Sequence, residues 1–309
     1  MRKAILISTA VVILLTRSLA QADGWRPSLG HVQVPIWPGA IPDAILNPKP
    51  ESVDPTEGRE WWPRVNDVSR PTMTVYAAKS RNTGVAMVVF PGGGFKFLAM
   101  DLEGTEICDW LTSIGITCVL SKYHIPNSNR YWDQGCACRI TPKVPRVLQD
   151  ARRTIKLVRA RAKELNVDPN KIGVIGFSAG GYLVAQTSNI FKPAYTPVDA
   201  VDDLSSRPDF AIALYPGHLC RSGNNLDPVI HVTKQTPPTF LLQTWDDPID
   251  NICNSTVNAR ALDHTGVPAE VHLFARGGHA FGLRNNGHPI SSWPSLVESW
   301  LKEIGILQT

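Results

Sequence analysis

The strongest constraint on this chain lies in residues 171–185, which run Lys-Ile-Gly-Val-Ile-Gly-Phe-Ser-Ala-Gly-Gly-Tyr-Leu-Val-Ala. The β-branched apolar residues at 172–175 predict a buried strand, and the apolar residues at 182–185 predict the start of a buried helix. Between them stands a G-x-S-x-G pentapeptide centred on Ser178. A sharp turn between a strand and a helix strains the backbone of this serine and exposes its hydroxyl at the strand's end. Ser178 is therefore the predicted nucleophile, and its context disfavours the alternative of a chance glycine-rich turn.

A second glycine loop follows another predicted strand. The apolar strand predicted at 84–90 runs directly into Pro-Gly-Gly-Gly-Phe at 91–95. Three glycines after a strand let the backbone approach a ligand and turn its N–H groups into a cavity, whereas the alternative is a flexible turn. Together with Ser178, the loop predicts that the N–H groups of Gly93, Gly94 and Ala179 form an oxyanion hole.

Strands and helices alternate along the rest of the chain. The further predicted strands are 68–76 at a sheet edge, 116–120, 210–214, 239–243 and 270–274, and the predicted helices are 103–111, 150–165, 257–265 and 293–304. Such spacing needs crossover connections, so it predicts an α/β fold with a mostly parallel sheet covered by helices on both faces. The basic residues of 150–165 are expected to form a solvated face.

A serine hydroxyl needs a base, and that base needs a partner that fixes its tautomer. His279 follows the last predicted strand on a glycine-rich loop, and we predict that it is the base. Of the other histidines, His288 is the nearest rival because it also lies beyond that strand. The remaining six are His31, His124, His218, His231, His264 and His272.

Three acidic residues follow the strand at 239–243, and one of them is the expected partner of the base. We choose Asp247, which is followed by Pro and Ile, with Asp246 as the alternative. Asp250 is expected to lie too far along the loop. The carboxyl ends of parallel strands share one edge of a sheet, so that edge is the expected place for all these groups.

The N-terminus predicts export. Residues 1–22 have a basic start, a short apolar run and small residues before two possible cleavage points, which is typical of a signal peptide; an uncleaved anchor is the alternative. Removing its three positive charges lowers the net charge from +4 to +1, so no nucleic-acid partner is expected. We expect an irregular arm at 23–64, a single domain at 65–309, and a secreted or periplasmic protein without a membrane partner after cleavage.

Export makes disulfides possible for the six cysteines, which are Cys108, Cys118, Cys136, Cys138, Cys220 and Cys253. The spacing of Cys136 and Cys138 argues against a bond between them, and Cys108 and Cys118 are equally compatible with buried free thiols. The cysteine and histidine spacing does not fit a zinc site, so neither a metal nor a cofactor is expected.

Several stretches together resemble one family. They are Pro-Gly-Gly-Gly-Phe at 91–95, Asp-Leu-Glu-Gly at 101–104, Gly-Phe-Ser-Ala-Gly-Gly at 176–181, Thr-Pro-Pro-Thr-Phe at 236–240, Asp-Asp-Pro at 246–248 and Gly-Gly-His-Ala-Phe-Gly at 277–282. Over about residues 65–305 the chain resembles bacterial exported α/β-hydrolases of the acetyl xylan esterase-like group, many of which are labelled esterases or lipases. Two departures stand out: Pro91 replaces the His of the lipase-type loop, as is usual in this group, and Asp-Asn-Ile-Cys-Asn at 250–254 replaces a Val- and Glu-containing pattern that is common after the acid.

The resemblance implies a Ser178–Asp247–His279 carboxylesterase that acts on small-molecule or polysaccharide esters, with Gly93 and Gly94 as oxyanion residues. The alternatives are a serine peptidase of the prolyl-oligopeptidase type and an inactive carbohydrate-binding hydrolase fold. Three long polar loops, at 121–147, 186–208 and 218–238, favour a sugar over a fatty chain and thus short acyl groups. The aromatic residues expected to face the sugar are Tyr123, His124, Tyr131, Trp132, Tyr195 and Tyr215.

Overall fold

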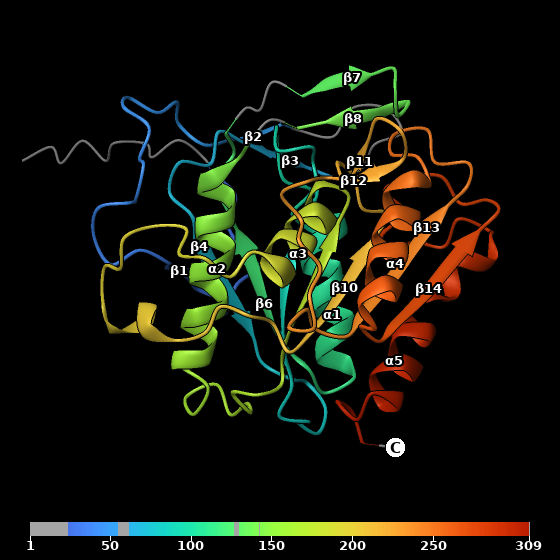
Figure 1. The fold of residues 1–309 in the computed structure, drawn as a ribbon. Helices are drawn as coiled ribbons and strands as arrows, with labels where there is room; N and C mark the ends of the chain where they lie inside the picture. Colours follow the sequence, from blue (N-terminus) through green and yellow to red (C-terminus); the bar gives the residue numbers. More distant parts are fainter. Residues whose placement is uncertain (1–23, 55–61, 127–129, 142, 309) are drawn as a thin grey trace, which may run out of the picture.

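The computed structural model describes residues 24–54, 62–126, 130–141 and 143–308. The predicted signal peptide lies outside these residues. In the described part, eight strands form one sheet in the order β1-β4-β6-β5-β9-β10-β13-β14 (Figure 1). Their bounds, in chain order, are β1 Gln33–Pro35, β4 Thr72–Tyr76, β5 Ala86–Phe90, β6 Thr117–Lys122, β9 Ile172–Phe177, β10 Phe210–Leu214, β13 Thr239–Thr244 and β14 Ala269–Phe274.

The sheet is parallel from β6 to β14, and only β1 and β4 run antiparallel to their neighbours. The prediction of a mostly parallel sheet is therefore confirmed. The prediction that residues 68–76 form an edge strand is wrong, because β1 pairs with the outer side of β4. The segment 23–64 is thus not wholly irregular: it contributes β1 to the main sheet and β2 (Ser52–Asp54), which pairs with β3 (Arg64–Asn66).

Helices cover both faces of this sheet. They are α1 Glu106–Ser113, α2 Pro145–Ala160, α3 Ala179–Asn189, α4 Cys253–Thr265 and α5 Trp293–Glu303, and a π-helical turn at Asp101–Thr105 leads into α1. Consecutive residues of a strand point to opposite faces. In β9, a Cβ on Gly176 would meet Val184 of α3, whereas the next residue, Phe177, contacts Trp293 of α5. The helices α3 and α5 therefore lie on opposite faces.

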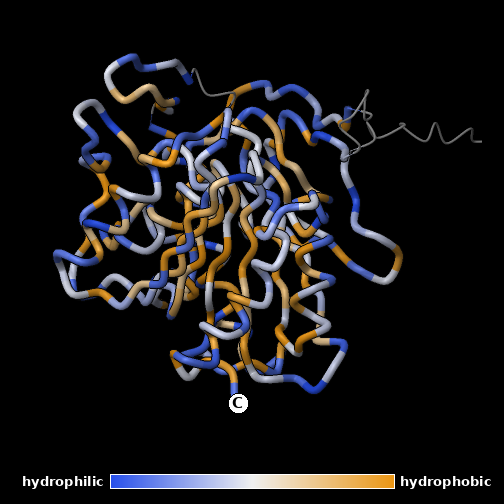
Figure 2. The backbone as a smooth tube through the Cα atoms, turned by 90° about the vertical axis from the view of Figure 1, so that its right-hand side faces the viewer, coloured by the Kyte–Doolittle hydropathy of each residue, from blue (hydrophilic) through white to orange (hydrophobic). Residues whose placement is uncertain are grey.

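The apolar residues gather in the central strands. Every residue of β5, β6, β9, β10 and β13 is buried, and the tube in Figure 2 is most hydrophobic along these strands. Burial of apolar surface on this scale is the main force that fixes the sheet. Within the described residues no helix is both long enough and apolar enough to cross a bilayer.

The basic residues of α2 do not form the solvated face that the sequence predicts. Arg152, Arg153 and Lys156 are buried. Arg153 donates to Asp199 at 2.6 and 2.7 Å, and Lys156 Nζ lies 2.6 Å from the carbonyl oxygen of Asp202. These partners come from the loop after α3, so the basic residues of α2 hold that loop against the helix rather than face water.

Candidate active site

The turn between β9 and α3 presents Ser178 as the sequence predicts. Ser178 has a φ of 53° and a ψ of −117°, a left-handed conformation that costs a non-glycine residue on the order of 1–3 kcal/mol. Glycines close the turn: a Cβ on Gly176 would collide with the carbonyl of Gly180, and one on Gly180 would collide with the carbonyl of Phe90. The tight packing of strand against helix therefore fixes the strained serine at the carboxyl end of β9.

The structure brings together the three side chains that the sequence selects. Nε2 of His279 lies 3.0 Å from Oγ of Ser178, and Nδ1 of the same ring lies 2.7 Å from Oδ2 of Asp247. The Asp247 carboxylate is fully buried, and only 9% of the His279 side chain is exposed. The arrangement has the geometry of a nucleophile, a base and an orienting acid.

The two competing acids occupy other positions. Asp246 is exposed, and its Oδ1 accepts the backbone N–H of Gly278 at 2.9 Å, which holds the loop that carries the histidine. That hydrogen bond lowers the pKa of Asp246. The expectation that Asp250 lies too far along the loop is wrong, because its Oδ2 lies 3.4 Å from Oγ of Ser178. The acid that contacts Nδ1 is nevertheless Asp247.

His279 is surrounded by negative charge. Burial lowers its pKa, but the hydrogen bond that the ring donates to Asp247 and the charges of Asp250, Asp247 and Glu103 raise it, and the net shift is upward. A base with a raised pKa is a stronger proton acceptor once it is neutral. The ring also stands against Tyr215, with ring centroids 4.9 Å apart.

The glycine loop after β5 lies directly beside the nucleophile. A Cβ on Gly92 would be 3.0 Å from Cβ of Ser178, and Gly93 and Gly94 both have positive φ angles, of 129° and 62°. As the first residue of α3, Ala179 has a backbone N–H without an acceptor in its own helix. These positions are consistent with the predicted oxyanion hole.

Glu103 and Tyr215 are residues whose contribution the sequence analysis missed. Oε2 of Glu103 accepts the N–H of Gly92 at 2.7 Å, and Oε1 accepts the hydroxyl of Tyr215 at 2.9 Å. Burial raises the pKa of Glu103. The side chain thus ties the glycine loop to the loop after β10, and the Asp-Leu-Glu-Gly stretch is the signal that pointed to it.

Two of the other described histidines pair with carboxylates outside the triad. His124 is buried with its Nδ1 2.6 Å from Asp150, and His272 pairs with Glu270 at the same distance. His288, the nearest rival, precedes the 3₁₀ turn at Pro289–Ser292.

All six cysteines are paired, in the bonds Cys108–Cys118, Cys136–Cys138 and Cys220–Cys253. The expectation against a Cys136–Cys138 bond is wrong because these residues lie at the closed end of a hairpin formed by β7 (Tyr131–Asp133) and β8 (Cys138–Ile140). The free-thiol alternative for Cys108 and Cys118 is also wrong, because the helix α1 and the following strand β6 bring them together.

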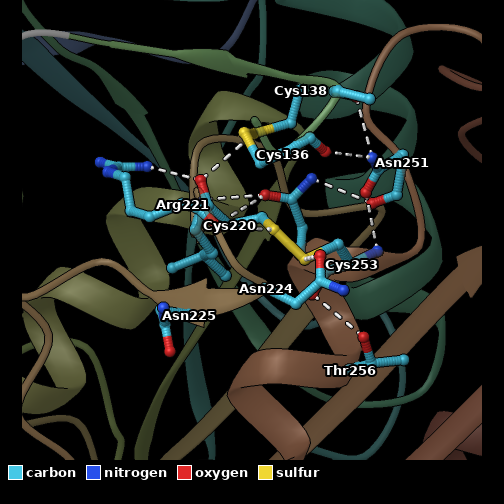
Figure 3. Close-up of a disulfide and its surroundings, with 12 residues drawn as sticks. Cys136, Cys138, Cys220, Arg221, Asn224, Asn225, Asn251, Cys253 and Thr256 are labelled. Atoms are coloured by element: carbon cyan, nitrogen blue, oxygen red, sulfur yellow. Dashed lines mark hydrogen bonds between the residues drawn. A yellow bond between two sulfur atoms is a disulfide. The ribbon is translucent and has the colours of Figure 1, made fainter. Parts of the chain in front are cut away.

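Two of these bonds brace the loops around the site (Figure 3). Cys220, in the short hairpin of β11 (Cys220–Arg221) and β12 (Asn225–Leu226), is bonded to the first residue of α4. Asn251, next to Asp250, donates to the carbonyl groups of Cys136 and Ala137 at 3.0 and 2.9 Å. The β7–β8 hairpin is therefore fastened to the loop that carries both Asp247 and Asp250.

Only part of the expected aromatic surface is exposed. Tyr123, His124 and Tyr215 are buried, so the expectation that they face a sugar is wrong. Tyr195 is half-buried and donates to Asp202. The β7–β8 hairpin instead exposes 54% of Tyr131 and 50% of Trp132.

Comparisons with known proteins agree with the fold. A family model described as the prolyl oligopeptidase family matches residues 149–305, which is just over half of the chain and includes all three triad positions. A solved acetyl ester-xyloside bifunctional hydrolase from Caldicellulosiruptor lactoaceticus is 32% identical, with a TM-score of 0.69 over 89% of this chain and 97% of that chain.

Two curated relatives are more distant. An acetylxylan esterase of Xylanibacter ruminicola is 26% identical over 247 residues, which are 72% of this chain and 45% of that protein. Endo-1,4-beta-xylanase B of Butyrivibrio fibrisolvens is 26% identical over 222 residues, 65% of this chain and 33% of that protein. The chain thus spans less than half the length of these curated relatives. From the family match and the solved relative, the chain belongs to the prolyl oligopeptidase family of serine hydrolases with the α/β-hydrolase fold, in its acetyl xylan esterase-like group.

Proposed function

We propose that this protein is a serine carboxylesterase that removes short acyl groups, acetyl above all, from plant polysaccharide or its sugars. The observation that carries the proposal is the line of contacts from Asp247 through His279 to Ser178, with 2.7 and 3.0 Å between the joined atoms. The names of the acetylxylan esterase and of the acetyl ester-xyloside hydrolase support the choice of an acetylated sugar.

The proposed reaction proceeds through an acyl-enzyme. Oγ of Ser178 attacks the ester carbonyl while Nε2 of His279 accepts its proton, and Asp247 stabilises the imidazolium that results. The negative charge on the carbonyl oxygen faces the N–H groups of Gly93, Gly94 and Ala179. His279 then gives its proton to the departing sugar hydroxyl. A water molecule gives a proton to the same ring and its oxygen bonds to the acyl carbon. The bond from that carbon to Oγ of Ser178 then breaks, Oγ takes the proton back from His279, and the carboxylic acid leaves.

We further propose that the enzyme acts outside the cytoplasm. The support is the predicted signal peptide at residues 1–22, together with the disulfides that pair all six cysteines. Disulfides persist in oxidising compartments and are rare in the cytosol. A secreted or periplasmic enzyme would also have access to plant polysaccharide.

The proposed esterase has one competitor within its own family, a serine peptidase, which the family's description favours. The two share a nucleophile but differ in the leaving group. Release of acetate from acetylated xylan, with no cleavage of prolyl peptide substrates, would support the esterase, whereas cleavage of the peptides without release of acetate would reject it.

We expect kcat/KM for 4-nitrophenyl esters to fall with acyl length, with C2 to about C4 esters hydrolysed far faster than C8 or longer. The physical reason is that the buried carboxylate of Asp250 stands 3.4 Å from Oγ of Ser178, where an apolar acyl slot would need hydrocarbon. In an apolar slot each added methylene would contribute about 0.8 kcal/mol, and kcat/KM would rise. A monotonic rise from C2 to C8 would therefore contradict the short-acyl proposal.

We expect Trp132→Ala to raise KM for acetylated xylan by about tenfold, a loss of roughly 1.4 kcal/mol, while kcat/KM for 4-nitrophenyl acetate changes less than about twofold. Trp132 is half exposed on a hairpin fastened to the acid loop, and an indole face suits the apolar face of a sugar ring. Leu46→Ala, at an exposed residue of the N-terminal arm, is the control. Equal losses on both substrates would show that the hairpin supports the catalytic centre and not the polymer.

A further inference from the structure

Asp250 lies on the opposite side of the catalytic ring from Asp247. Its Oδ2 is 3.4 Å from Oγ of Ser178 and 3.9 Å from Nε2 of His279, whereas Asp247 contacts Nδ1. The residue is 1% exposed. A triad of nucleophile, base and acid needs only the carboxylate at Nδ1, so the second buried carboxylate at the reacting atoms calls for an explanation.

We propose that Asp250 is a second acid of the catalytic centre, which shares the hydroxyl of Ser178 with His279 and stabilises the imidazolium that forms when the serine gives up its proton. The proposal rests on the proposed function, because it assigns a role in that reaction.

The surroundings hold this carboxylate in place. A Cβ on Gly217 would lie 2.5 Å from Oδ2, 2.7 Å from Cγ and 2.8 Å from Oδ1 of Asp250, so the carboxylate rests flat against a residue that has no side chain. The backbone is held as well, because the N–H of Asp250 donates to Asp247 Oδ1 at 2.9 Å and its carbonyl accepts from Gln243 at 2.6 Å. Oδ1 of Asp250 is buried without a hydrogen-bond partner. A well-packed carboxylate with unused acceptor capacity suits an electrostatic role better than a structural one.

The charges that face the two acids and the ring come from several loops. Arg130, from the segment before β7, lies against Gly94 and interacts electrostatically with Asp250. His218, from the loop after β10, interacts with the same carboxylate. Glu103 acts on His279 from the π-helical turn, and Tyr215 stands against the ring.

In the proposed role, acylation moves a single proton, which starts on the hydroxyl of Ser178. The hydroxyl proton of Ser178 passes to Nε2 of His279, which becomes a cation between Asp247 and Asp250. Oγ bonds to the acyl carbon, and the proton on Nε2 then leaves with the alcohol. Asp250 exchanges no proton in these steps. Its charge favours the charged ring, so it eases proton removal from the serine.

The sign of the pH effect follows from this charge. Only neutral His279 accepts the serine proton, so activity is lost as pH falls through the pKa of His279. Asp250 raises that pKa. Removing its charge in Asp250→Asn should therefore move the acid limb of the kcat/KM profile for 4-nitrophenyl acetate to lower pH by about one unit, and should lower the plateau about tenfold.

The control is Asp263→Asn, which removes an exposed carboxylate from α4 and should leave the profile unchanged. Gly217→Ala provides a second variant, which keeps the charge but displaces the carboxylate from its present contact with Ser178, because the new Cβ would overlap it. It should shift the acid limb in the same direction by a smaller amount. An acid limb that stays in place or moves to higher pH in Asp250→Asn would overturn the proposal. If Asp250→Asn does not fold, an acid limb that stays in place or moves to higher pH in Gly217→Ala would overturn it instead.

A reaction that needs no carboxylic ester separates this proposal from the proposed function. The phosphorus of diethyl 4-nitrophenyl phosphate is attacked by Oγ of Ser178, 4-nitrophenolate leaves, and His279 takes the proton. The pH dependence of this inactivation should show the same downward shift in Asp250→Asn. If the wild-type protein is inactivated but does not deacetylate xylan, the proposed substrate fails, and the position of the acid limb still decides the role of Asp250.

Discussion

Replacing Ser178 by alanine is expected to lower kcat for 4-nitrophenyl acetate by on the order of 10⁴-fold or more while the fold remains intact. The substitution removes Oγ, the atom that stands 3.0 Å from Nε2 of His279. Without it no acyl-enzyme forms, and only binding and the oxyanion donors remain to accelerate direct attack by water. Alanine keeps the backbone N–H through which residue 178 donates to Leu214 at 3.1 Å, so the turn should survive.

The measurement is kcat together with a thermal unfolding curve for each variant. Ser299→Ala, at an exposed hydroxyl on α5, is the matched control and should behave as wild type. Near-normal turnover in Ser178→Ala with an unchanged unfolding curve would show that another group is the nucleophile. Loss of turnover accompanied by a much lower melting temperature would instead indicate that the turn itself had failed.

The parts of the fold that were predictable are those that local sequence encodes. The strand ending at Phe177 and the turn at Ser178 follow from β-branched residues and from glycines that packing requires. β1 was not predictable in this way, because it has three residues without a clear alternation and exists only by pairing with β4. Its stability comes from the sheet that it joins and not from its own sequence.

The buried basic residues of α2 show a second limit. Arg153 is buried because Asp199 and Asp202, more than forty positions away in the chain, supply the matching charges. The residue pattern of a helix identifies its apolar face. It does not reveal an acidic partner, distant in the sequence, that allows the basic face to be buried as well. The same reasoning applies to Cys136 and Cys138, whose bond depends on the hairpin geometry and not on spacing alone.

The three residues that the structure brings together as a candidate triad were predictable as chain positions, since each follows a predicted strand. The charges that act on the candidate base were not predictable from the sequence. The loop conformation after β13 places Asp250 near Ser178, and the π-helical turn places Glu103 where its charge acts on His279. The Asp-Leu-Glu-Gly stretch points to Glu103, but no short pattern encodes the conformations that bring these two charges to the site. The sequence did flag the region of Asp250, because residues 250–254 depart from the resembling group.

Asp247→Asn is expected to lower kcat/KM for 4-nitrophenyl acetate by about 10³- to 10⁴-fold, and Asp246→Asn by less than about tenfold. The difference follows from what each carboxylate contacts. Oδ1 of Asp247 accepts the N–H groups of Ile249 and Asp250 at 2.8 and 2.9 Å, while Oδ2 faces Nδ1 of His279. In the asparagine variant the amide oxygen keeps the two backbone contacts, so the NH₂ group faces the ring.

That orientation is what disables the base. An NH₂ group facing Nδ1 of His279 requires that nitrogen to accept, which places the ring proton on Nε2 and leaves no lone pair there for the hydroxyl of Ser178. Asp246 differs because its Oδ1 accepts the N–H of Gly278, and an amide oxygen accepts that bond equally well. Measuring kcat/KM for both variants therefore ranks the two acids directly. If Asp246→Asn proved the more damaging, the orienting acid would be Asp246, and the contact between Asp247 and Nδ1 would not be the one used in catalysis.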